Sequence, residues 1–111
     1  MPDDTQREKR NREAAPMVII AGYTLVDEGQ RDAYVEAHSK LVKRARASDG
    51  CIDVAITADT VDERRVNVLE VWTSSEALDA WRAKARPPRT GIKPAEMQVR
   101  RFNAEDGGPL F

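Results

Sequence analysis

The stretch VNVLEVWTSSEALDAW, residues 66–81, decides the fold because a strand pattern changes to a helix pattern in its middle. Residues 66–72 carry β-branched and apolar side chains on both alternating sets, which is typical of a strand covered on both faces. Thr73 or Ser74 can accept from the first free backbone N–H groups of a helix, and Glu76 would complete a capping box with Thr73. We therefore expect a strand that leads directly into a helix.

Similar patterns occur on either side of this stretch. They predict a strand at 17–25, a helix at 30–47, a strand at 51–58 and a last strand at 95–102. Gly50 suits the left-handed cap that ends the first helix, and Pro87 stops the second. The order strand, helix, strand, strand, helix, strand predicts an α+β, ferredoxin-like βαββαβ fold, a four-stranded antiparallel sheet with two helices on one face.

The strands are apolar on both sides, although two helices can cover only one side of such a sheet. The first strand carries Met17, Ile19 and Ala21 on one face and Val18 and Ile20 on the other. The simplest cover for the second apolar face is the same face of a second copy, related by a twofold axis. The sequence therefore predicts a homodimer.

Two strand residues need an explanation of their own. Gly22 lies in the middle of the first strand, where the missing side chain predicts a β-bulge; the alternative is a ligand that approaches the backbone there. Glu70 is central in its strand, and we expect it to pair with a basic residue such as Arg100 or Arg101.

Composition limits the classes of function. With 111 residues the chain is long enough for one domain, and its 18 basic residues nearly balance 19 acidic ones, which favours neither nucleic acid nor a membrane as partner. The single cysteine and the lack of an apolar span or secretory signal predict a cytoplasmic protein. We expect residues 1–16 to be a disordered charged tail, or an arm over a partner subunit, residues 17–103 to form the domain, and residues 104–111 to be an irregular tail.

Three short segments resemble the antibiotic biosynthesis monooxygenase domain family. They are VLEVW at 68–72, SSEALDA at 74–80, and the helix-ending SDGC at 48–51. The resemblance covers roughly residues 17–103. It implies a dimeric α+β barrel in which two sheets close around a shared interior, and it matches Glu70 and Trp72 to the family's Glu-x-Trp strand position.

The resemblance also implies a chemistry that needs no cofactor. An electron-rich phenol, hydroquinone or anthrone-like molecule would be deprotonated in a pocket between helices and sheet, and its anion would reduce O₂. The protein would bind the small aromatic molecule, orient it and stabilise the anion. No metal or nucleotide motif is present in the sequence, so we predict neither a metal site nor another cofactor.

Two departures from the family pattern limit what can be carried over. Where many members have His-Leu-Ala-Ser-Pro-His on the second helix, this chain has WRAKAR at 81–86, so both histidines are replaced. Members that degrade haem use an asparagine on the first strand. The matching stretch IAGY at 20–23 has none, although Trp81 aligns with the helical tryptophan of that branch. Haem degradation is therefore not expected.

His38 is the candidate catalytic residue. It is the only histidine, and helical periodicity places it in an apolar stripe with Tyr34, Leu41 and Ala45. A neutral imidazole there could act as a general base. The alternative is a hydrogen-bonded core histidine, which is the commoner use of a lone histidine on an apolar face.

Five further residues are candidates for substrate binding. Trp72 and Trp81 could stack on a planar aromatic molecule, or belong to the core. The hydroxyls of Tyr23 and Tyr34 could orient a substrate oxygen. Asn67 could bind a ligand oxygen, or make a hydrogen bond across the dimer.

Two functions from different classes follow. The first is a small cofactor-independent monooxygenase for electron-rich aromatic molecules. The second is a non-catalytic dimeric domain of the same fold that binds a small apolar ligand, because a fold alone does not decide function.

Overall fold

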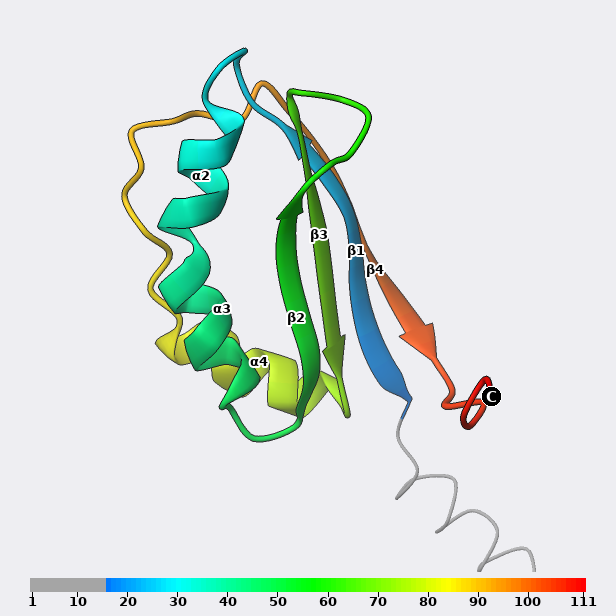
Figure 1. The fold of residues 1–111 in the computed structure, drawn as a ribbon. Helices are drawn as coiled ribbons and strands as arrows, with labels where there is room; N and C mark the ends of the chain where they lie inside the picture. The colour runs from blue at the N-terminus through cyan, green and yellow to red at the C-terminus, as the bar shows by residue number, and fades with distance from the viewer. Residues whose placement is uncertain (1–15) are drawn as a thin grey trace, which may run out of the picture.

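A computed structural model describes residues 16–111 of the chain (Figure 1). Its elements are β1 (Met17–Leu25), α2 (Arg31–Ala37), α3 (Ser39–Arg46), β2 (Cys51–Ala58), β3 (Arg65–Trp72), α4 (Ser75–Lys84) and β4 (Glu96–Ala104). The predicted charged tail lies outside the described residues, apart from Pro16. None of the helices in residues 16–111 is long and apolar enough to cross a membrane.

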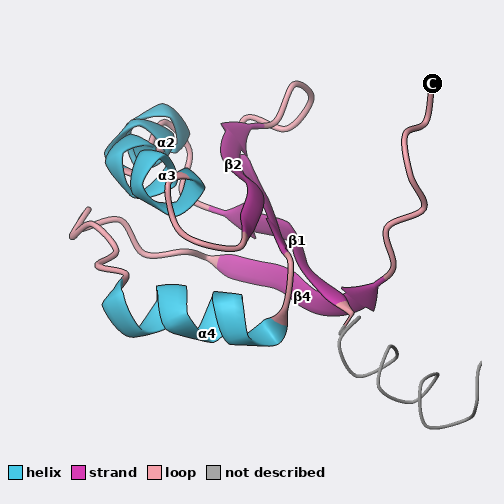
Figure 2. Cartoon of the chain, turned by 90° about the horizontal axis from the view of Figure 1, so that it is seen from below, coloured by secondary structure: helices cyan, strands magenta, loops and turns pink. Residues whose placement is uncertain are grey.

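The four strands form one antiparallel sheet in the order β2-β3-β1-β4. Seen from below, α2 and α3 lie beside β2 while α4 lies beneath β1 and β4, all on the same face of the sheet (Figure 2). This arrangement confirms the predicted ferredoxin-like fold. The stretch 66–81 is β3 followed by α4, so strand does lead directly into helix.

The face of the sheet that carries the helices holds the core. Even-numbered residues of β1 and β3 point to this face, where Val18 pairs with Trp72 and Thr24 pairs with Val66. All four are fully buried. Val18, Ile20 and Trp72 form one hydrophobic cluster with Val54 of β2 and with Ala45, Leu78 and Trp81 of the helices.

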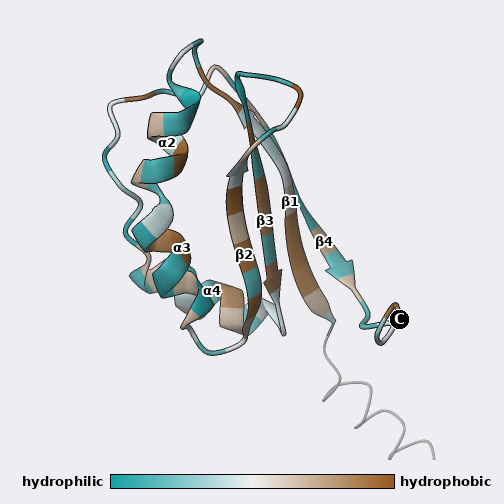
Figure 3. Cartoon of the chain, in the orientation of Figure 1, coloured by the Kyte–Doolittle hydropathy of each residue, from teal (hydrophilic) through white to brown (hydrophobic). Residues whose placement is uncertain are grey.

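The opposite face of the sheet is apolar but uncovered in one chain. Ile19 pairs with Val71 of β3 and with Phe102 of β4, and Ala21 pairs with Leu69. Apolar residues follow one another along β1, β2 and β3 (Figure 3). Phe102 is 47% exposed and Leu69 is 37% exposed. We call this surface the open face.

Gly22 does not mark a bulge, so that prediction is wrong. The pairing of β1 with β3 and β4 is continuous through Gly22, and the irregularity lies instead between Cys51 and Asp53 of β2. Gly22 has φ 151°, and a Cβ there would clash with the backbone oxygen of Gln98. Glycine is needed because β4 approaches the backbone of β1 too closely for a side chain.

The start of α4 differs in detail from the predicted capping box. Ser74, not Thr73, is the N-cap, and its hydroxyl accepts from the backbone N–H of Ala77 at 3.1 Å. The third helical position is therefore Ala77, which has no side-chain acceptor to complete the box. Gly50 has φ 79° as predicted, and its oxygen accepts from Thr73 N at 2.8 Å, which joins the turn before β2 to the turn before α4.

Candidate functional site

The predicted helix 30–47 is interrupted at His38, its only histidine. The backbone N–H of His38 donates to Val35 O, three residues back, at 3.1 Å. A regular α-helix would direct it to Tyr34 O, four residues back. The chain therefore forms α2 and α3 as two short helices, with His38 as the residue between them.

This interruption fixes the tautomer of His38. Its Nδ1 lies 2.7 Å from the backbone oxygen of Tyr34. The backbone N–H of His38 does not use that oxygen, because it donates to Val35 O. A carbonyl oxygen can only accept, so Nδ1 carries the hydrogen and the lone pair of the neutral ring is on Nε2. His38 is buried, with 8% of the residue exposed. It has the protonation pattern that a general base requires.

Tyr34 packs against His38 with its side chain. The two ring centroids are 4.4 Å apart and the rings are tilted by 37°. Burial raises the pKa of the Tyr34 hydroxyl, so this group remains a hydrogen-bond donor at neutral pH. Two of the predicted site residues, His38 and Tyr34, are thus adjacent.

Trp72 and Trp81 stack on each other inside the core. Their ring centroids are 6.2 Å apart, and the residues are 0% and 7% exposed. The indole Nε1–H of Trp72 donates to Glu70 Oε1 at 3.1 Å. Glu70 therefore has a tryptophan as its partner, and the predicted ion pair with Arg100 or Arg101 does not occur among the ion pairs of residues 16–111.

Tyr23 and Asn67 lie on the open face, away from His38. They are paired across β1 and β3 in the odd-numbered register. Asn67 is already engaged: its Nδ2 donates to Asp59 Oδ1 at 2.9 Å, and its Oδ1 accepts from Arg65 Nε at 2.7 Å. Arg65 in turn lies over the Tyr23 ring at 4.0 Å. The two faces of the sheet therefore divide the six predicted site residues into separate groups.

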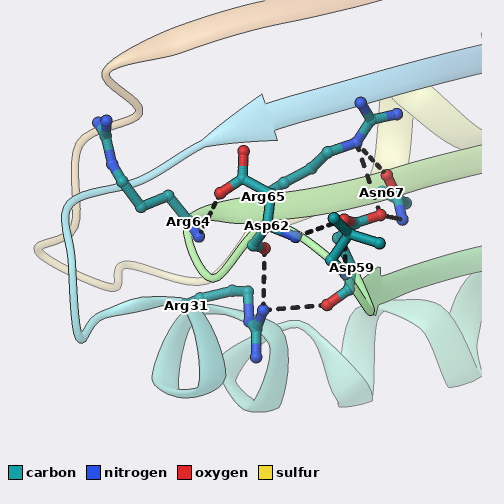
Figure 4. Close-up of polar contacts among 7 residues, drawn as sticks. Arg31, Asp59, Asp62, Arg64, Arg65 and Asn67 are labelled. Atoms are coloured by element: carbon teal, nitrogen blue, oxygen red, sulfur yellow. Dashed lines mark hydrogen bonds and ion pairs between the residues drawn. The ribbon is translucent and has the colours of Figure 1, made fainter.

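Asp59 is the centre of the polar network that holds the β2–β3 loop (Figure 4). Its side chain accepts from Asn67, from Asp62 N at 2.8 Å and from Val61 N at 3.1 Å. These hydrogen bonds, led by that from Asn67, lower the pKa of Asp59 to about 2. Arg31 of α2 donates to the backbone oxygens of Asp59 and Asp62, both at 3.0 Å, and so ties the loop to the helices.

Cys51 lies at the start of β2 and is a free thiol. Burial, with smaller effects from Asp53 and Glu70, raises its pKa, so the thiol stays protonated and is a poor nucleophile.

A groove lies between the α2–α3 pair and the segment after α4. Its volume is about 550 Å³. It is lined by Ala37, Lys40, Leu41, Lys43, Arg44, Arg86 and Pro88. Helical periodicity indicates that the three cationic residues of α3 point away from the core, but no pattern in the sequence reveals that the segment after α4 returns alongside them. The groove was therefore not predictable from local sequence patterns.

Solved structures of other proteins have the same fold. A Nitrosomonas europaea protein with the provisional name antibiotic biosynthesis monooxygenase has a TM-score of 0.72 and 16% identity, over 86% of this chain and 96% of that one. A Chloroflexus aurantiacus protein with the same provisional name has a TM-score of 0.59 and 25% identity, over 86% and 99%. A Bacteroides thetaiotaomicron protein of unknown function, described as a possible oxidoreductase, has a TM-score of 0.68 and 19% identity, over 81% and 99%.

The sequence itself identifies the family. No curated protein is similar enough to count as a relative. The family model for antibiotic biosynthesis monooxygenase matches residues 16–86, from the residue before β1 to the segment after α4. This match covers more than half of the chain and includes His38, both tryptophans and the strand-to-helix stretch 66–81. The chain therefore belongs to the antibiotic biosynthesis monooxygenase family.

Proposed function

We propose that this protein is a cofactor-independent monooxygenase that oxidises an electron-rich aromatic molecule, such as a phenol, hydroquinone or anthrone, with O₂. The observation that carries the proposal is the hydrogen bond from His38 Nδ1 to Tyr34 O, because it leaves the basic lone pair on Nε2. The neighbouring Tyr34 hydroxyl, a hydrogen-bond donor, would orient the substrate oxygen. Family membership supports the same chemistry.

The reaction can be written with all atoms accounted for, using an anthrone as the example. His38 Nε2 removes a proton from the substrate, and the resulting anion gives its electrons to O₂ as a C–O bond forms. The imidazolium returns the proton to the outer oxygen, which gives a hydroperoxide on the substrate. The O–O bond then breaks with loss of water and leaves a C=O group, so one oxygen atom enters the product and the other enters water. The role of His38 is to take and return one proton.

We propose that the working unit is a homodimer joined through the open face. Ile19, Leu69, Val71 and Phe102 gather on this face, and Leu69 and Phe102 are substantially exposed in one chain. An uncovered apolar surface of this kind favours association with a copy of itself. Tyr23 and Asn67 would then lie in the interior shared by the two sheets, apart from the His38 side of each chain.

Turnover with and without His38 tests the proposal. Purified protein, free of flavin, metal and haem, should oxidise at least one member of a hydroquinone and anthrone panel, with O₂ consumed in proportion to product. His38→Ala should lower the rate by roughly 10²- to 10⁴-fold while binding survives. If the panel binds but never turns over, the protein is a binding domain instead.

The tautomer can be measured directly because the chain has one histidine. Nitrogen-15 NMR of the imidazole should give one set of signals, with the hydrogen on Nδ1 and a bare Nε2. The partner is a backbone oxygen, so Tyr34→Phe should preserve this pattern. A hydrogen on Nε2 in the wild-type protein would contradict the assigned role of His38.

A further inference from the structure

The groove between the α2–α3 pair and the segment after α4 is lined by three apolar and four cationic residues. Leu41, Ala37 and Pro88 supply the apolar surface, and Lys40, Lys43, Arg44 and Arg86 supply the charges. Its walls come from two parts of the chain, the α2–α3 pair and the segment after α4, which run alongside each other in Figure 1. A volume of about 550 Å³ is within the range that holds a small organic molecule.

The groove concentrates positive charge in a chain whose net charge is −1. None of the described lining residues is acidic. The ion pairs found within residues 16–111 involve Arg31, Arg46 and Arg65, and none of these lines the groove. An anionic group in the groove would therefore lie near four cationic residues, with no carboxylate among the described lining residues.

Arg44 holds the two walls together. Its Nη2 donates to the backbone oxygen of Arg86 at 3.2 Å, and its guanidinium lies over the Trp81 ring, 5.9 Å from the centroid. The segment after α4 is thereby fixed against α3. The groove is built by these contacts rather than by a chance approach of surface side chains.

The helix dipole alone does not explain the four positive charges of the groove. Basic residues near the end of a helix interact favourably with its dipole, and Lys43 and Arg44 lie in the last turn of α3. Lys40, however, is the second residue of α3, where a cation is disfavoured, and Arg86 lies beyond the end of α4. The helix dipole therefore explains two of the four cations and does not explain Lys40 or Arg86.

We propose that this groove binds the acidic group of an aromatic acid, with its rings against Leu41 and Pro88. The statement that this ligand is the substrate rests on the proposed function, whereas the binding itself does not. Ala37, which lines the groove, is the residue before His38 in the chain. The protein would thus select carboxylated or similarly anionic aromatic molecules over neutral ones.

Two dyes that share an aromatic skeleton test the binding. Anilinonaphthalene sulfonate is anionic, and N-phenylnaphthylamine is its neutral counterpart; neither is a substrate for oxygenation. We expect fluorescence titration to give at least a roughly tenfold lower Kd for the anionic dye at low salt, with the preference shrinking as salt screens the charges. Equal Kd values for the two dyes would overturn the proposal.

Variants locate the site. The double change Lys43→Gln with Arg86→Gln should weaken the anionic dye by roughly fivefold or more and leave the neutral dye unchanged. Arg44 is kept because it holds the groove together. The double change Arg82→Gln with Lys84→Gln removes the same two charges from exposed positions on α4 that do not line the groove, and it serves as the control. Equal effects of the double variant and the control would place the dye elsewhere and refute the groove.

The dye result and the turnover result are separate. If the dyes discriminate and no phenol is oxidised, the groove stands and the enzyme proposal fails. If oxidation occurs and the dyes do not discriminate, the enzyme proposal stands and the groove proposal fails. Where both succeed, a carboxylated hydroquinone should have a lower KM than methylhydroquinone, and the double variant should raise only that KM, with kcat unchanged.

Discussion

The indole of Trp72 donates to the carboxylate of Glu70, two residues earlier on β3, and both side chains face the helices. The Nε1–H of a fully buried tryptophan needs an acceptor, and the alternation of a strand places residue 70 on the required face. The Glu-x-Trp pattern is thus a local hydrogen bond in this protein. If Glu70 took part in catalysis and gave up this bond, the Nε1–H of Trp72 would need another acceptor.

A double-mutant cycle measures this bond. Glu70→Leu should destabilise the protein by about 1–3 kcal/mol because it leaves a buried N–H unpaired, and Glu70→Gln should be milder because an acceptor remains. Combined with Trp72→Phe, the Glu70→Leu change should show a coupling of about 1 kcal/mol or more in urea unfolding. Additive effects would mean that the bond contributes nothing.

Gly22 should tolerate no side chain. Gly22→Ala must overcome both the contact with β4 and a positive φ, and we expect a loss of roughly 2–4 kcal/mol or failure to fold. Gly29→Ala is the matched control, because Gly29 also has a positive φ but open space around its Cβ position. Urea unfolding of the control should show a loss of only about 1 kcal/mol. Similar losses for both variants would exclude a special role for the β4 contact.

Asp59 should make stability depend on acid pH. Its pKa of about 2 in the folded state lies below the ordinary value of 3.8, so the folded protein favours the carboxylate. The stabilisation is complete above about pH 4 and is lost as pH falls toward 2. Thermal melts of wild type and Asp59→Asn should therefore differ most at neutral pH and converge toward pH 2. A difference that stays constant over this range would contradict the assignment.

Leu69 and Val68 are neighbours on β3 that face opposite sides of the sheet. Leu69→Glu should give a folded monomer, because it puts a charge on the proposed dimer surface. Val68→Glu, in the register of Gly22 and Ile56, should destabilise the core of the single chain. Sedimentation and circular dichroism distinguish the two outcomes. A wild-type protein with the mass of one chain at micromolar concentration would remove the dimer proposal.

The sequence carried enough local information for the fold because each element had its own signal. Strand alternation, Gly50 and the Ser-rich start of α4 act within a few residues, and the order of elements then leaves one compact arrangement. Some of the errors concern contacts between distant segments. Gly22 is explained by β4, about 76 residues later in the chain, and pattern alone does not distinguish a close strand from a bulge.

The candidate site was predictable only in part for the same reason. Periodicity placed His38 and Tyr34 on one stripe, and they do lie together. It gave no sign that the helix breaks at His38, because no glycine or proline marks the position. Tyr23 and Asn67 lie on the other face of the sheet from the remaining candidates because of the strand register. The cationic groove depends on the path of the segment after α4.

The break between α2 and α3 links the regularity of the backbone to the protonation of a side chain. The Tyr34 oxygen can receive the backbone N–H of residue 38, as in an unbroken helix, or the ring N–H of His38, as observed. A substitution that repaired the helix would make the ring N–H share this oxygen with the backbone N–H, which would weaken the preference for one neutral form of the imidazole. Greater local helicity would then divide the protein into two populations, only one of which has its basic nitrogen at Nε2. The irregular turn thus favours the neutral imidazole that has its hydrogen on Nδ1.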